Sequence, residues 1–70
     1  MFIESDFYYI VVNINGKKFF VAKDMSYTDN FSNVMKFNFN KDAEDFIIGH
    51  NLHEKNAIII KRIGVKNLKE

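Results

Sequence analysis

The amino-terminal third of the chain has the pattern of a β-hairpin. Residues 7–14 consist almost entirely of β-branched and aromatic residues, which favour strands. The next two residues, Asn15 and Gly16, suit a two-residue type I′ turn, because both of its central positions need a positive φ that Asn tolerates and Gly adopts freely. We therefore predict a hairpin over residues 7–23.

This turn determines which residues of the hairpin lie opposite each other. Val12 is expected opposite Phe19, and Val11 opposite Phe20. One face of the hairpin then carries Tyr8, Ile10, Val12, Ile14, Phe19 and Val21. The other face carries Phe7, Tyr9, Val11, Phe20 and Ala22, with Asn13 and Lys18 towards the turn. Both faces of the hairpin are therefore apolar.

Two further strands are predicted downstream of the hairpin. Apolar and polar residues alternate over 35–40, which indicates a third strand. The β-branched run over 57–63 indicates a fourth strand, and residues 64–70 are expected to form a flexible tail. The polar segment 24–33 between the hairpin and the third strand is expected to be a loop with a short helical turn.

One short α-helix is predicted over residues 41–49, with Asn40 as its N-cap and Gly49 as its stop. Acidic residues in its first turn complement the helix dipole. One stripe of residues follows the helical spacing i, i+3, i+4, i+7. The stripe consists of Ala43, Phe46, Ile47 and His50.

These elements predict a single α+β domain over residues 1–70, with a small antiparallel sheet of three to four strands that starts with the hairpin. One short helix is packed on one face of the sheet, and it cannot cover the second face as well. Either the carboxyl-terminal tail or the 24–33 loop folds over that second face, or it mediates homodimerisation or partner binding. The predicted partner-binding residues are Phe7, Tyr9, Val11, Lys18 and Phe20.

The composition is that of a folded domain with a marginal core. Apolar residues make up 47% and charged residues 27% of 70 residues, so the chain is too hydrophobic for disorder but short for a stable core. It has no cysteine, which leaves association as its means of stabilisation. No apolar run is long enough to span a membrane, and the amino terminus lacks a basic leader, so a cytoplasmic location is expected.

The sequence predicts no enzyme, no cofactor and no metal site. It lacks a nucleophile in a catalytic motif, and its three glycines are isolated, which excludes a phosphate-binding loop. Asp42, Glu44 and Asp45 are explained by the helix dipole. His50 and His53 have the spacing of a weak metal-ligand pair, but their position in a loop favours ordinary surface residues.

The charge distribution leaves a second function open. The net charge is only +1, yet the last sixteen residues carry five basic residues against one acidic residue. A small protein that binds RNA or single-stranded DNA would combine such residues with the aromatic sheet face. Its candidate residues are Lys18, Lys61, Arg62 and Lys66. The motif of RNA-binding sheets is missing and the basic excess is small, so nucleic acid is the secondary prediction.

Residues 28–37 (TDNFSNVMKF) and 41–47 (KDAEDFI) resemble a pattern in short phage and plasmid reading frames of low-GC Gram-positive bacteria, in which a hairpin precedes a turn and a short acidic helix. The resemblance implies an accessory protein of a virus or mobile element, a class that includes inhibitors of host enzymes and of CRISPR effectors. We therefore expect a non-enzymatic protein-binding module, such as an anti-CRISPR inhibitor, whose partner is a host protein or protein complex.

Overall fold

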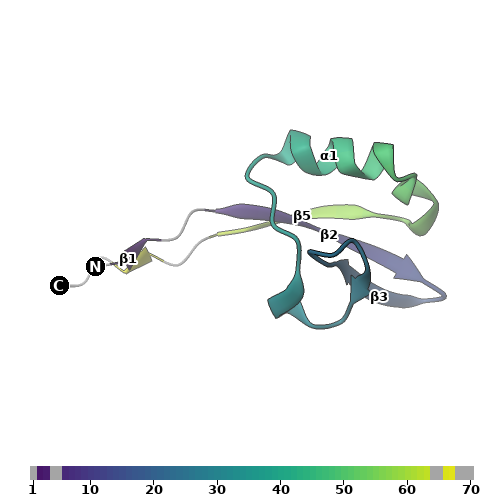
Figure 1. Cartoon of the computed structure of the whole chain (residues 1–70), viewed down its shortest axis with the longest axis horizontal. Helices are drawn as coiled ribbons and strands as arrows, with labels where there is room; N and C mark the ends of the chain where they lie inside the picture. The colour runs from purple at the N-terminus through teal and green to yellow at the C-terminus, as the bar shows by residue number, and fades with distance from the viewer. Residues whose placement is uncertain (1, 4–5, 64–65, 68–70) are drawn as a thin grey trace.

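The computed structural model describes residues 2–3, 6–63 and 66–67 of the chain. As predicted, it is a small α+β fold in which one helix lies on one face of a four-stranded antiparallel sheet (Figure 1). The strands follow the order β4-β3-β2-β5. They are β2 (Phe7–Ile14), β3 (Lys17–Val21), β4 (Tyr27–Thr28) and β5 (Ile58–Arg62).

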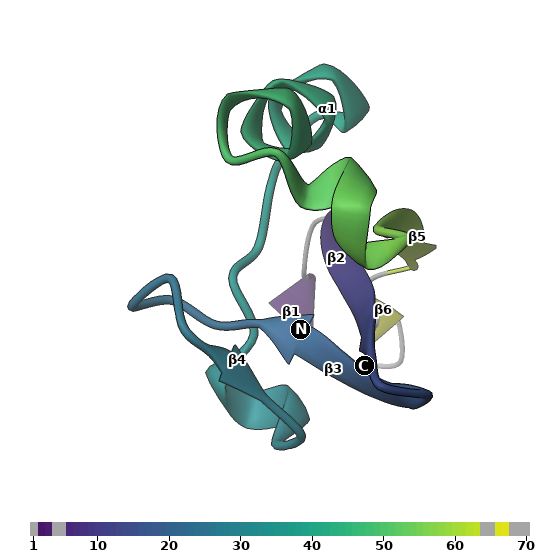
Figure 2. The same cartoon turned by 90° about the vertical axis from the view of Figure 1, so that its right-hand side faces the viewer.

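The remaining elements are α1 (Asn40–Gly49), the 3-10 turns η1 (Phe31–Asn33) and η2 (Leu52–Lys55), and the short strands β1 (Phe2–Ile3) and β6 (Lys66–Asn67). β1 and β6 pair with each other at one end of the molecule, away from α1 (Figure 1). In the view along the long axis, α1 and β4 lie on opposite sides of the hairpin strands (Figure 2). Of the segment 64–70, predicted to be a flexible tail, the two residues of β6 are described. The other residues of that segment lie outside the described part of the chain.

The predicted hairpin and its register are confirmed. Val11 lies opposite Phe20, and Val12 lies opposite Phe19. Asn15 and Gly16 form the turn with φ values of 54° and 82°, as a type I′ turn requires. The hairpin ends at Val21 instead of residue 23.

The predicted strand over residues 35–40 is wrong. This segment makes two isolated bridges instead, Ala22 with Val34 and Tyr8 with Phe37. It lies between the diverging ends of β2 and β3: the Met35 amide donates to the Val21 carbonyl at 2.9 Å, and the Phe37 amide donates to the Tyr8 carbonyl at 2.9 Å. A regular ladder cannot form because each bridge uses a different strand, and α1 begins only three residues after Phe37.

The core lies between the sheet and α1, as the hairpin pattern and the helical stripe predict. Its buried side chains are Ile10, Val12, Val21, Ala43, Ile47 and Leu52. Leu52 of η2 is 3% exposed and was not expected in the core, because a single apolar residue in a polar loop gives no periodic signal.

The ends of α1 differ in detail from the prediction. Asn40 is the first helical residue rather than the cap, and Phe39 occupies the N-cap position without a side-chain hydrogen bond. After the helix, Asn51 and not Gly49 adopts the left-handed conformation, with φ of 55°. Asn is the residue that tolerates this conformation best after Gly.

Candidate protein-binding surface

The face of the sheet opposite α1, which we call the aromatic face, is partly covered by the segment between β3 and α1 (Figure 1). Phe31 of η1 lies over it, with ring centroids 5.0 Å from Tyr9 and 5.3 Å from Phe20 in edge-to-face geometry. Phe7 completes the cluster at 6.3 Å from Phe31. Of the alternatives that the sequence left open for this face, the structure has the one in which the 24–33 loop folds over it.

This cover changes the surface predicted for partner binding. Val11 is only 7% exposed, so the expectation that it forms part of an open patch is wrong. Phe7, Tyr9 and Phe20 are half-buried, and Lys18 is exposed near the turn. A role of these residues in binding stays a prediction, with much less free area than the hairpin pattern alone indicates.

Among the described residues, the basic side chains proposed for nucleic-acid binding do not gather in one place. Lys18 and Arg62 pair with Asn13 and Phe7 of β2, which are six residues apart and therefore separated by about 20 Å. The Arg62 guanidinium lies 5.0 Å from the centroid of Phe31 on the aromatic face. Lys61 alternates to the opposite face, and the side chain of Lys66 is outside the described part.

The free edge of β5 was not predicted as a site. Among the residues that the structure describes, β5 pairs with β2 only and is the last strand of its sheet. The sequence predicts the strand itself, but its place at an edge depends on the strand order, and no local pattern determines that order.

The backbone of β5 presents hydrogen-bonding groups at this edge. Both the amide and the carbonyl of Tyr8 bond to Phe37, on the side of β2 away from β5. The direction of the backbone hydrogen bonds alternates from residue to residue along an antiparallel strand. Phe7 and Tyr9 of β2 therefore form their backbone hydrogen bonds with β5, and their partners there are Arg62 and Ile60. Ile59 and Lys61 therefore direct their amides and carbonyls away from the sheet.

Apolar side chains flank the edge on both faces. Ile58 is 53% exposed on the aromatic face, and Ile48 of α1 is 62% exposed on the face that carries the helix. A groove of about 410 Å³ lies between α1 and β5. Its lining combines Ile47, Ile48, Ala57, Ile58 and Ile59 with the polar residues Glu44 and His53. We call the β5 backbone edge and this groove the β5 edge surface.

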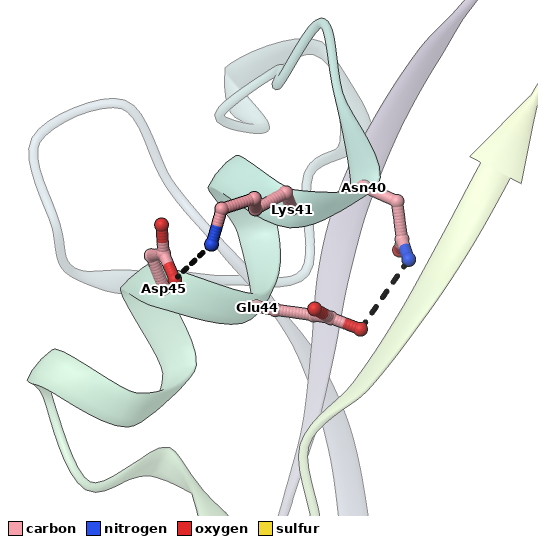
Figure 3. Close-up of polar contacts among 4 residues, drawn as sticks. All are labelled: Asn40, Lys41, Glu44 and Asp45. Carbon is pink, nitrogen blue, oxygen red and sulfur yellow. Dashed lines mark hydrogen bonds and ion pairs between the residues drawn. The ribbon is translucent and has the colours of Figure 1, made fainter.

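Glu44 gives the groove a negative charge. The side-chain nitrogen Nδ2 of Asn40 donates to the Glu44 carboxylate at 3.4 Å, whereas Lys41 pairs with Asp45 at 3.6 Å on another side of the helix (Figure 3). The opposite end of β5 is positive, since Lys61 and Arg62 are both exposed. Lys61 lies 3.8 Å from Asp6, and the two side chains are 49% and 37% exposed. The β5 edge surface therefore has an acidic end and a basic end.

The histidines and the remaining acidic residues do not converge on a reaction centre in the described part. His50 stacks on Phe46 with centroids 4.0 Å apart, and His53 belongs to the groove. A second hollow of about 390 Å³ beside β4 contains Asp24. The Ser26 hydroxyl and amide donate to this carboxylate and lower its pKa, which is the usual chemistry of an Asx turn.

Within the described ranges no three His, Cys, Asp or Glu residues are grouped as a metal site would need. None of the helices described is long and apolar enough to cross a membrane. No protein-family model, curated protein or solved structure matches the chain.

Proposed function

We propose that this chain is a non-enzymatic protein-binding module that takes an extended segment of another protein as an added strand beside β5. The observation that supports it is the free edge of β5 between exposed apolar side chains. Most proteins blunt such edges with charges, bulges or short strands. In β5 the only two charged residues stand at the end of the strand, after three consecutive isoleucines, Ile58 to Ile60. The first three residues of this edge therefore carry no charge.

The energetics of strand addition fit this surface. The outward amides and carbonyls of Ile59 and Lys61 supply up to four backbone hydrogen bonds, and backbone bonding of this kind gives affinity that does not depend on the partner's side chains. Full burial of an isoleucine contributes about 1.5–3 kcal/mol. The half-exposed Ile48 and Ile58 therefore add about 2–3 kcal/mol together.

The partner that we propose is a host protein or protein complex in the cytoplasm of a bacterial cell. The likeness of residues 28–37 and 41–47 to short phage and plasmid reading frames supports this class and an inhibitory role. An inhibitor of a host or defence protein acts by occupying a surface in a fixed stoichiometry. A strand-accepting edge is suited to that task, because it holds an extended segment of the partner through backbone hydrogen bonds. The partner then cannot use that segment for its own contacts.

The test compares two substitutions at one position. Lys61→Pro removes the outward amide of β5 together with the charge, whereas Lys61→Ala removes the charge alone. The outward amide takes no part in pairing with β2, so both variants should keep the fold, which circular dichroism checks. A partner captured from a bacterial lysate and identified by mass spectrometry should be retained on immobilised Lys61→Ala protein and lost from Lys61→Pro protein.

Retention of the captured protein by the Lys61→Pro variant would exclude strand addition at β5. If Lys18→Glu instead abolished that retention, the partner would lie on the aromatic face. Binding that falls steeply with salt and disappears after nuclease treatment would indicate nucleic acid as the ligand.

A further inference from the structure

We infer that, in the absence of a partner, a second copy of the chain occupies the β5 edge surface in an antiparallel, two-fold symmetric arrangement centred on Ile60. The inference rests on the proposed function, since it names what covers the same edge when the partner is missing. It follows from the bonding directions, the charges and the apolar side chains of β5.

The outward backbone amides and carbonyls of β5 determine how the two copies of this strand align. Centring the pair on Ile60 places Ile59 of each copy opposite Lys61 of the other, so that all outward amides and carbonyls of these residues find partners. Centring it on Ile59 would pair Lys61 with Ala57, whose amide already donates to the Leu52 carbonyl at 3.3 Å. Centring it on Lys61 would place two lysines opposite each other, which is unfavourable.

The charges favour the same register. Ile59 and Lys61 point to the face of the sheet that carries α1, and Ile59 lines the groove together with Glu44. Opposite Ile59, Lys61 of the second copy therefore lies at the groove of the first copy, near the Glu44 carboxylate, and the symmetric contact repeats this pair. The Lys61 contact with Asp6 within one copy is long and solvent-exposed, so it competes weakly.

The apolar side chains are covered in the same arrangement. On the aromatic face Ile60 meets Ile60 of the second copy. Arg62 lies opposite Ile58, which is 53% exposed in the single chain, and its aliphatic stem covers that side chain while the guanidinium keeps its contact with the Phe31 ring. The two four-stranded sheets become one continuous sheet. A partner strand then has to displace the second copy, so dimerisation and partner binding exclude each other.

The experiment is sedimentation equilibrium of the purified full-length chain over a range of concentrations. The unchanged protein should dimerise, and Lys61→Pro should be monomeric with a native circular dichroism spectrum. Glu44→Lys and Lys61→Glu should each weaken the dimer about tenfold, because each creates two like-charge contacts. An equimolar mixture of these two variants should dimerise within about threefold of the unchanged protein, since opposite charges then meet at both contacts.

A chain that is monomeric at every concentration, or a mixture that dimerises no better than its components, would overturn this inference. If such a monomer still captured a partner in a manner sensitive to Lys61→Pro, the proposed function would stand without the dimer. If the unchanged chain dimerised through β5 but the captured partner ignored Lys61→Pro, the dimer would stand and the proposed function would fail.

Discussion

At the scale of single residues, Gly16 and Gly49 differ in whether their backbone conformation requires glycine. A Cβ added at either position would meet no atom within 4 Å, so space does not distinguish them. Gly16 has a φ of 82°, whereas Gly49 ends α1 without a positive φ. The side chain of Asn13 also accepts a hydrogen bond from the Gly16 amide at 3.0 Å, so the turn depends on the backbone conformation at this position.

We therefore expect Gly16→Ala to lower the free energy of unfolding by about 1 kcal/mol, because alanine is strained at positive φ. Gly49→Ala should raise it by about 0.5 kcal/mol, because alanine loses less entropy in a helix. Urea unfolding at neutral pH measures both changes. A loss of stability in both variants would mean that crowding, and not φ, limits these positions.

At the scale of elements, the turn η1 acts as a lid for the aromatic face. Phe31 contacts Tyr9 and Phe20 edge to face, and the Asn30 side chain caps the turn by accepting from the Ser32 amide at 3.1 Å. The side chain of Phe31 thus packs this polar segment onto the aromatic face.

Removing this side chain should open the aromatic face. We expect Phe31→Ala to destabilise the fold by about 2 kcal/mol, because a half-buried ring and its aromatic contacts are lost. Phe39→Ala is the matched control, since Phe39 is 66% exposed, and should cost less than about 0.5 kcal/mol. Urea unfolding gives both values, and binding of a hydrophobic dye should increase for Phe31→Ala only. Equal effects of the two substitutions would contradict a lid at Phe31.

At the scale of the whole molecule, α1 lies on one face of the small sheet and η1 lies over the other, and we propose the edge of β5 as the place where another chain extends that sheet. Folding and association are therefore linked by mass action if a second copy binds there.

We expect the midpoint of thermal unfolding to rise by about 5 °C when the protein concentration increases a hundredfold. The Lys61→Pro variant should unfold at a midpoint that does not depend on concentration, because its edge cannot complete the hydrogen bonds of the dimer. Differential scanning calorimetry at several concentrations makes the comparison. A constant midpoint for the unchanged chain would show that folding does not depend on a second copy.

The sequence by itself determined the elements whose signals are local. Asn15 and Gly16 determine the turn and, through it, the register of Val11 with Phe20, because a two-residue turn admits one pairing. The stripe that contains Ala43 and Ile47 determines which side of α1 is buried, because its spacing matches the helical period.

Only the tertiary structure decided the order of the strands and what covers each face. The alternation of apolar and polar residues over 35–40 predicts a strand. Because β2 and β3 diverge there, the chain forms two isolated bridges instead, at Val34 and at Phe37. Phe31 has no periodic neighbours, so its place over Tyr9 depends on long-range packing. The β5 edge surface joins Glu44 and Ile48 of α1 to Ile58 of β5, which lie ten or more positions apart in the chain. Such contacts depend on packing between elements, and no local spacing of residues encodes them.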